Sequence, residues 1–240
     1  MMNMKILGCL HAHYSNIKYI EEGLNSYPIR FQHFVDPGLM IRATHEEAIT
    51  TLQAKNKVME QLSWIASCGV DAIVITCTNY IAFLDDEFSL DIPIIKIDEP
   101  FFRIFAKYPS PKVLVFTNPA TVSGTTERYH QYLKKANLPV EYDTKIINGA
   151  FDYVMNGQIA KHDGIVSNAL KEFSATFSSI AVAQLSMVQA SAAVQGEILN
   201  PLKPLIMEIL TQLNLPVEGN EVNGNTVDKN FYCCSKIREL

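Results

Sequence analysis

Apolar residues in this chain gather in short continuous runs, and longer segments with helical spacing separate the runs. A short continuous apolar run predicts a buried strand, and apolar residues at every third or fourth position predict a helix. Continuous strands that alternate with helices predict a parallel sheet covered on both faces, so the predicted fold class is α/β. The strongest predicted strands span 5–10, 71–76, 112–117 and 179–185, and weaker ones span 30–35, 92–97 and 141–147.

The longest helical pattern lies between residues 44 and 67. Thr44 and Glu47 have the spacing of a capping box, which predicts the start of this helix. Trp64 and Met59 fall within it, and we expect them in the core or in a dimer contact.

The two halves of the chain resemble each other in order and spacing. KILGCLHA aligns with KVLVFTNPA at an offset of 107 residues, and residues 27–38 align with 138–149 at an offset of 111. DAIVITCT aligns with IAVAQLSM at an offset of 109, which places Cys77 over Ser186. Parallel α/β chains share such patterns in general, but a nearly constant offset in three segments favours an internal duplication.

A duplication predicts two pseudo-symmetric α/β domains, each built on a parallel sheet. The first is expected to hold residues 1–105 with about 203–240, and the second residues 106–202. Ligands of open parallel sheets bind outside the carboxyl ends of the strands. We therefore expect the active site in a cleft between the halves, with Cys77 on one side and Ser186 on the other.

Cys77 follows the predicted strand DAIVIT and precedes two residues that commonly start helices, Thr78 and Asn79. A helix N-terminus lowers the pKa of a thiol, and its backbone N–H groups bind carboxylates. The segment therefore offers an acid/base and an anion site together. The competing interpretation is a small buried apolar side chain, which is the usual role of a free cysteine.

Other polar side chains also follow predicted strands. Serine needs an activating partner to act as a base, so Ser186 is expected to hydrogen-bond a ligand oxygen. The segment FTNPAT offers short polar groups that could fix a carboxylate or simply stabilise a turn. In LHAHYS, the alternating pair His11 and His13 could act as acid and base or bind a metal. The segment FTNPAT contributes Thr117, Asn118 and Thr121.

Composition excludes several classes of function. The net charge of −5 over 240 residues argues against a nucleic-acid partner, which requires a clustered basic surface. No apolar run approaches the roughly 18 residues that span a bilayer, so no membrane role is expected. The five cysteines, Cys233 and Cys234 among them, suggest neither a disulfide framework nor a zinc knuckle, and a cytoplasmic location is the simplest expectation.

Four motifs together resemble the aspartate/glutamate/hydantoin racemase superfamily over most of the chain up to about residue 200. ITCTN resembles the Cys-Asn-Thr motif of that superfamily, with the last two residue types exchanged. FTNPATVSGTTERYH resembles its Thr-x-x-x-Thr segment and the following helix with a tyrosine, here Tyr129. NGAFDYVMNGQIAKHD resembles a linker, and AQLSM resembles a subgroup signature at the position of the second catalytic cysteine.

The resemblance implies two α/β halves in pseudo-twofold symmetry, no cofactor and no metal. It implies acid/base chemistry by Cys77 at the carbon next to a carboxylate, on a small carboxylate-bearing substrate. The second cysteine of the superfamily is Ser186 here, so its two-thiol mechanism is not expected intact, and His11 is a candidate for a second base. The remaining residues implied in substrate binding are Thr78, Asn79, Thr117, Asn118, Thr121 and Met187. A homodimer is also implied.

Other functions stay open from the sequence. A single thiol also fits a decarboxylase or isomerase of a small dicarboxylic acid that protonates one face only. A non-catalytic ligand-binding homologue would keep the site and lack the exchange chemistry. A metal-dependent hydrolase built on His11 and His13 would need further ligands at later strand ends.

Overall fold

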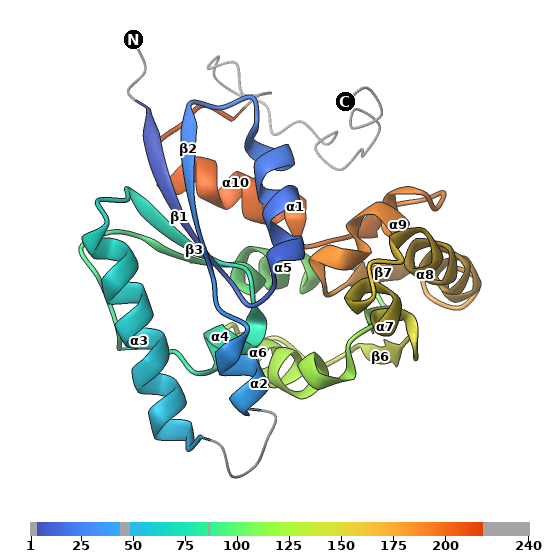
Figure 1. Ribbon diagram of the computed structural model, residues 1–240. Coiled ribbons are helices and arrows are strands. Elements are labelled where there is room, and N and C mark those ends of the chain that lie inside the picture. Colours follow the sequence, from blue (N-terminus) through green and yellow to red (C-terminus); the bar gives the residue numbers. More distant parts are fainter. Residues whose placement is uncertain (1–3, 44–48, 86, 218–240) are drawn as a thin grey trace, which may run out of the picture. The chain divides into compact units, whose positions relative to one another are not determined.

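The computed structural model describes residues 4–43, 49–85 and 87–217, and these residues form two four-stranded parallel sheets (Figure 1). The strand orders are β2-β1-β3-β4 and β6-β5-β7-β8, so both sheets have the same topology. The chain divides into two compact units. The first holds the described residues up to Ala106, with Ala120–Pro139 and Pro201–Leu215, and the second holds Lys107–Pro119 and Val140–Asn200.

Both strongly apolar strands of the first unit lie in the middle of its sheet. β1 (Lys5–His11) pairs with β2 (Ile29–Val35) and with β3 (Ala72–Ile75), and β3 also pairs with β4 (Ile94–Lys96). Every residue of β3 is buried, as a central strand covered on both faces requires. All four predicted strands of this half are therefore confirmed, with ends shifted by up to two residues.

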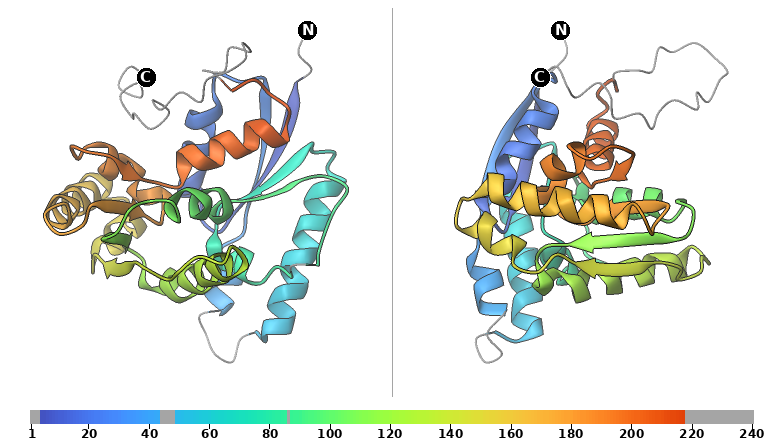
Figure 2. Two further views of the ribbon diagram at one scale, coloured as in Figure 1. Left: turned by 180° about the vertical axis from the view of Figure 1, so that it is seen from behind. Right: turned by 90° about the vertical axis from the view of Figure 1, so that its right-hand side faces the viewer.

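The helices of the first unit cover both faces of this sheet. A Cβ added to Gly8 would meet Ile65 of α3, so the even residues of β1 face that helix. A Cβ added to Gly23 of α1 would meet Ile206 of α10, and these two helices pack together beside the strands (Figures 1 and 2). The helical elements of this unit are η1 (Tyr14–Asn16), α1 (Ile17–Leu24), α2 (Gly38–Ala43), α3 (Thr51–Ser67), α4 (Thr78–Ala82), α5 (Asp98–Phe105), α6 (Val122–Lys135) and α10 (Leu202–Gln212).

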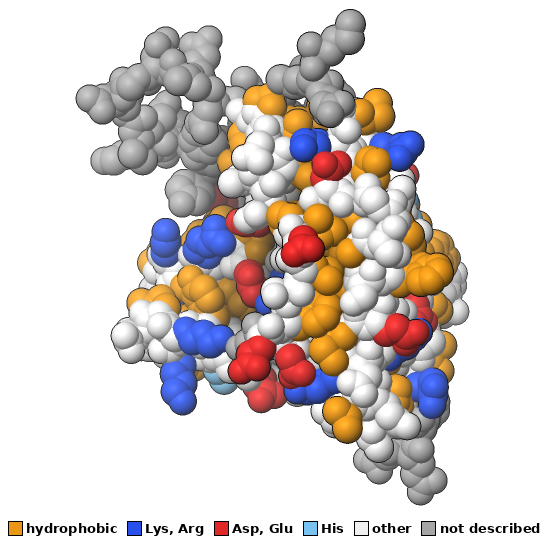
Figure 3. Space-filling view, turned by 90° about the vertical axis from the view of Figure 1, so that its left-hand side faces the viewer, with side chains coloured by type: hydrophobic (Ala, Val, Ile, Leu, Met, Phe, Trp, Pro, Cys, Tyr) orange, Lys and Arg blue, Asp and Glu red, His pale blue; other side chains and the backbone are white. Residues whose placement is uncertain are grey.

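The long helix α3 begins at a capping box, but not at the predicted one. Thr50 accepts a hydrogen bond from the backbone N–H of Gln53, and the Gln53 side chain accepts one from the backbone N–H of Thr50. Thr44 and Glu47 lie outside the described residues. Trp64 is 70% exposed, so its expected core position is wrong, and apolar side chains reach the surface on this side of the unit (Figure 3). A dimer contact at this face stays a prediction.

The second unit repeats the design of the first. β5 (Lys112–Phe116) pairs with β6 (Asp143–Ile146) and β7 (Ser179–Val182), and β7 pairs with β8 (Ile198–Leu199). Its core joins the buried residues of β5 and β7 to those of α8. The short strand β8 has no predicted counterpart in the sequence. The helical elements are η2 (Pro119–Thr121), which extends into the first unit, α7 (Ala150–Met155), α8 (Ile159–Phe173), η3 (Leu185–Met187) and α9 (Val188–Ala192).

Two equally ordered parallel sheets confirm the predicted fold class and the duplicated design. The strands β5 and β7 each begin 107 residues after β1 and β3, from 5 to 112 and from 72 to 179. One segment belongs to a different unit from the one expected. Ala120–Pro139, placed by sequence in the second domain, clusters with the first unit, where Tyr129 of α6 packs on Phe102 and Phe105 of α5.

Within the described ranges, no helix has both the length and the apolar character needed to cross a membrane. Cys233 and Cys234 lie outside the described residues.

Gly8→Ala is expected to lower the free energy of unfolding by about 1–3 kcal/mol, because the new methyl group overpacks the core. Its Cβ would lie 2.7 Å from Cγ2 of Ile65. The matched control is Gly164→Ala in α8, where an added Cβ meets nothing within 4 Å. That change should raise the stability by up to about 1 kcal/mol through helix propensity. Urea unfolding of both variants measures the difference, and equal stability of the two would contradict the packing of α3 on β1.

Candidate active site

Polar side chains gather at the carboxyl ends of the four strands in the first unit. His11 is the last residue of β1, Asp36 follows β2, Cys77 comes two residues after β3, and Asp98 comes two residues after β4. Parallel strands place these ends along one edge of the sheet, which is where open α/β sheets bind ligands. The candidate site is built on this edge.

Cys77 occupies the N-cap position of α4 in an extended conformation. Backbone N–H groups of Tyr80 and Asn79 favour its thiolate, whereas burial raises the pKa of the thiol and outweighs them. The nearby carboxyl group of Asp98 raises this pKa further. Cys77 is therefore a thiol at neutral pH. A ligand that brings positive charge close to the sulfur, or that neutralises the charge of the Asp98 carboxylate, would lower the pKa of Cys77 and favour the thiolate.

Asp98 forms a buried ion pair with Arg128 of α6. The guanidinium donates to both carboxylate oxygens, with Nη2 3.2 Å from Oδ1, while the side chains of Asp98 and Arg128 are 3% and 14% exposed. Burial nevertheless raises the pKa of Asp98, and the attraction of Arg128 only partly offsets it. Arg128 therefore links α6 to the electrostatics of Cys77 through one carboxylate.

Thr78 and Asn79 stand beside the thiol in the first turn of α4, half-buried. Their side chains form no hydrogen bond with other described residues. α6 packs closely on this turn, because a Cβ added at Gly124 would lie 3.1 Å from Oδ1 of Asn79. These two side chains thus leave polar atoms available next to the sulfur.

His11 is fully buried, and both of its ring nitrogens have neighbours. Nδ1 lies 2.8 Å from the Thr76 hydroxyl, and Nε2 lies 2.9 Å from Nδ1 of His33. Burial, with a smaller contribution from His33, lowers the pKa of His11 to about 4. His11 therefore lies next to the residue that precedes Cys77, and its role as a second base stays a prediction. His13 bonds instead to Ser15 in its own loop, with Nδ1 2.8 Å from Oγ.

In the second unit, Ser186 lies in η3, four residues after the end of β7, whereas Cys77 lies two residues after the end of β3. Gln184, in extended conformation at the N-cap of η3, is the residue that occupies the place of Cys77, so the sequence alignment of Cys77 with Ser186 is shifted by two residues.

Ser186 is half-buried, whereas Met187 is fully buried in the core of the second unit. Thr117 and Asn118 follow β5 in the same unit, and Thr121 immediately precedes α6 in the first. Their expected roles in ligand binding stay predictions.

The side chain of Gln184 forms hydrogen bonds that connect two strand ends of the second unit. Its side-chain oxygen accepts from the backbone N–H of Thr117 at 2.7 Å, from the Thr117 hydroxyl at 2.9 Å and from the backbone N–H of Asn118 at 3.0 Å. This single amide joins the carboxyl ends of β5 and β7. Thr117 is fully buried, so its hydroxyl serves this junction.

Sequence reasoning missed Asp36, Asp98, Arg128 and Gln184. Asp36 and Asp98 each directly follow a predicted strand, so the rule that selected Cys77 could also have selected them. The backbone oxygen of Asp36 accepts a hydrogen bond from the hydroxyl of Tyr80, which is buried in α4. Arg128 had no such signal, because its partner Asp98 lies 30 residues away.

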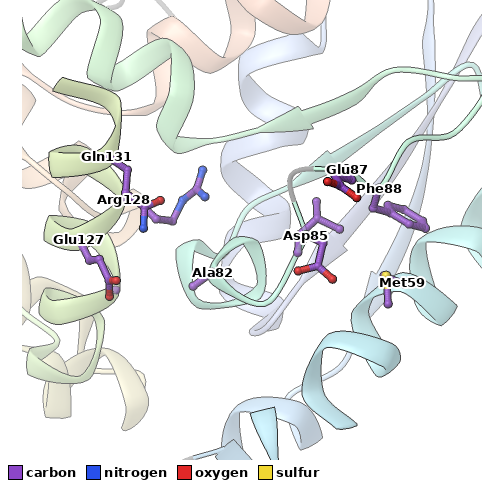
Figure 4. Close-up of a pocket in the computed structure, with 10 residues that line it drawn as sticks. Met59, Ala82, Asp85, Glu87, Phe88, Glu127, Arg128 and Gln131 are labelled. Atoms are coloured by element: carbon purple, nitrogen blue, oxygen red, sulfur yellow. The ribbon is translucent and has the colours of Figure 1, made fainter. Parts of the chain in front are cut away.

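A polar cavity of about 800 Å³ lies elsewhere in the first unit (Figure 4). It is lined by Met59 of α3, by the segment after α4, and by one face of α6 that includes Glu127 and Arg128. Cys77 is not among its described lining residues. Arg128 is the residue that this cavity shares with the ion pair beside Cys77.

Comparison with solved structures shows that several racemases have a similar fold. The chain is similar to an aspartate racemase from Picrophilus torridus, with a TM-score of 0.66, 16% identity, and coverage of 89% of this chain and 96% of that one. It is also similar to a glutamate racemase from Bacillus anthracis, with a TM-score of 0.63, 16% identity, and 88% and 82% of the two chains covered. The chain has the fold of the aspartate/glutamate/hydantoin racemases.

An allantoin racemase from Klebsiella pneumoniae shares this racemase fold at a TM-score of 0.59 and 15% identity, with 88% of this chain and 89% of that one covered. Neither protein-family models nor curated proteins match the sequence. The resemblance stated from the motifs is therefore supported at the level of the fold.

Asp98→Asn is expected to lower the pKa of Cys77, because it removes a negative charge that disfavours the thiolate. The measurement is the rate of Cys77 alkylation by iodoacetamide as a function of pH, with the modified peptide identified by mass spectrometry. The midpoint should move to lower pH in this variant and stay unchanged in the control Asp91→Asn, which alters an exposed carboxylate. An unchanged midpoint in Asp98→Asn would contradict the coupling.

Gln184→Ala should lower the free energy of unfolding by about 1–3 kcal/mol, because it leaves three donors without their shared acceptor. Gln184→Glu keeps an acceptor oxygen and should recover most of the loss. Chemical denaturation of both variants tests this, with Gln195→Ala at an exposed position after α9 as the control, and a loss in that control as large as in Gln184→Ala would count against the junction.

Proposed function

We propose that this chain is a cofactor-independent, racemase-like isomerase that acts at the carbon next to a carboxylate. The observation that carries the proposal is the position of Cys77, at the end of a buried strand and at the start of α4, in a racemase fold. Cys77 is the proposed acid/base. The proposed substrates are small amino acids and related carboxylates.

The surroundings of Cys77 support the proton chemistry. The thiolate takes the α-proton of the substrate and becomes a thiol, and the electron pair of the broken C–H bond moves into an enolate-like carboxylate. The thiol then returns the proton, or another donor delivers one to the opposite face. Backbone N–H groups of Asn79 and Tyr80 favour this thiolate, but burial keeps Cys77 protonated in the ligand-free chain, so the thiol must lose its proton before it acts as the base.

Thr78 and Asn79 are the proposed ligands of the substrate carboxylate in this unit. Their polar atoms are half-buried next to the thiol and are not used by other described residues. Hydrogen-bond donors placed at a developing oxyanion contribute strongly to such reactions. Thr121, which immediately precedes α6 in the same unit, is proposed to contribute a further polar contact, as the resemblance implies.

Ser186 supports a second candidate function. A hydroxyl is a much weaker acid than a thiol and lacks an activating base in the described part of η3. Protonation from one face only, as in a decarboxylase or a one-base isomerase, would need no second thiol. The two functions differ in whether the stereocentre inverts.

Cys77→Ala should lower the rate of α-proton exchange at least about 10²-fold, because the acid/base group is removed. Proton NMR in D₂O measures deuterium at Cα across a panel of D- and L-amino acids and substituted malonates. Cys68→Ala is the matched control, since Cys68 is an exposed cysteine at the end of α3 and should leave the exchange unchanged.

Exchange with inversion identifies a racemase with a second proton donor, and exchange without inversion identifies a one-thiol enzyme. Binding of panel members without any exchange would overturn the enzymatic proposal in favour of a ligand-binding protein. Equal loss of exchange in Cys68→Ala and Cys77→Ala would remove Cys77 from its proposed role.

A further inference from the structure

Three metal-binding side chains meet beneath helix α1, on the face of the first sheet opposite α3. The ligand atoms of Cys9, His11 and His33 all lie within 4.8 Å of one another. Cys9 and His11 are two residues apart on β1 and so point to the same face, and His33 pairs with Cys9 across to β2. The local register of two strands therefore assembles the group.

The two imidazoles face each other through one nitrogen each. Nε2 of His11 lies 2.9 Å from Nδ1 of His33, and the opposite nitrogen of each ring has a different partner. Nδ1 of His11 lies 2.8 Å from the hydroxyl of Thr76, and Nε2 of His33 lies 3.4 Å from the carboxylate of Glu21 on α1. His11 thus has an outer hydrogen-bond partner, and His33 has a carboxylate near its outer nitrogen without a hydrogen bond to it.

The Thr76 hydroxyl indicates where the ring proton of His11 lies. It donates to the backbone oxygen of Leu10 at 3.3 Å, which leaves Oγ1 to accept from Nδ1–H of His11. Nε2 of His11 then carries a lone pair directed at Nδ1 of His33, 2.9 Å away. A cation bound to both nitrogens would take the place of the hydrogen bond between them, and the ring proton of His33 would then lie on Nε2, which has no hydrogen-bond partner among the described residues.

We propose that Cys9, His11 and His33 form a binding site for a thiophilic transition-metal ion of the Zn²⁺ class. One sulfur and two imidazole nitrogens are ligands that suit such ions and that Mg²⁺ and Ca²⁺ avoid. Histidine ligands typically donate their other N–H to a carboxylate or hydroxyl. Nδ1 of His11 is hydrogen-bonded to Thr76 in this way, and the Glu21 carboxylate lies 3.4 Å from Nε2 of His33. This inference is independent of the proposed function.

Binding requires the ligand atoms to shift, by up to about 1.3 Å for the sulfur of Cys9, which lies within 4.8 Å of the two nitrogens. Tetrahedral Zn²⁺ places two nitrogen ligands about 3.3 Å apart and a nitrogen and a sulfur about 3.5 Å apart. The two nitrogens, now 2.9 Å apart, would separate by a few tenths of an ångström. His33 lies on the edge strand β2 with its side chain 16% exposed, and Glu21 is 53% exposed, so the ion enters from that side.

Before a metal binds, the two imidazoles are neutral and the thiol of Cys9 is protonated. Burial lowers the pKa of both histidines, so their lone pairs are available near neutral pH. Burial raises the pKa of Cys9, so binding must release its thiol proton to solvent as the metal–sulfur bond forms. The doubly charged ion with one thiolate leaves a net positive centre next to the Glu21 carboxylate.

The test is titration of the metal-free full-length chain with Zn²⁺ by calorimetry and with Co²⁺ by absorption spectroscopy. We expect one ion per chain, and Co²⁺ should give a thiolate-to-metal charge-transfer band. Cys9→Ala and His33→Gln should each abolish that stoichiometric binding. The matched controls Cys68→Ala and His130→Gln alter an exposed cysteine and an exposed histidine and should bind as the native chain does.

If Cys9→Ala or His33→Gln prevents folding, the variant Glu21→Gln still tests the proposal. Glu21 is half exposed, and loss of its carboxylate beside Nε2 of His33 should weaken Zn²⁺ binding about 10- to 100-fold. Absence of stoichiometric binding to the folded native chain would overturn the proposal and leave a hydrogen-bonded chain from Thr76 through His11 to His33. Loss of the ion on replacement of Cys233 and Cys234 by serine would overturn it as well.

Discussion

Burial of the central strands on both faces is the constraint on which the rest of the structure depends. β3 and β5 consist entirely of buried residues, and their backbone polar groups are satisfied by parallel neighbours on each side. A strand of this kind can expose chemistry only where it ends. Cys77 and Ser186 accordingly lie beyond the ends of β3 and β7, where open parallel sheets bind ligands.

The environment of Cys77 balances opposing effects. Burial and the Asp98 carboxylate disfavour the thiolate, whereas the first N–H groups of α4 favour it. Arg128 holds Asp98 in place, and by pairing with its charge it moderates the effect of that charge on the sulfur. The protonation state of the thiol therefore depends on groups that follow β3 and β4 and on Arg128 of α6.

Cys9 and Cys77 of the first unit have different surroundings. Cys9 is buried in the middle of β1, beside the imidazoles of His11 and His33. Cys77 stands at the strand end beside backbone N–H groups. A metal at the first position would leave the second free, and Thr76 connects the two regions through its hydrogen bond to His11.

The sequence by itself determined the α/β class, seven of the eight strands and the duplicated order, because continuous apolar runs encode buried parallel strands directly. It also located Cys77, since a polar residue after such a run marks a strand end. β8 was missed because two residues carry no periodic signal. Only the tertiary structure decided that α6 packs with the first unit, that Arg128 pairs with Asp98, and that His33 meets Cys9 and His11. Those contacts join residues that are distant along the chain, and strand register and helix packing, which no local pattern encodes, bring them together.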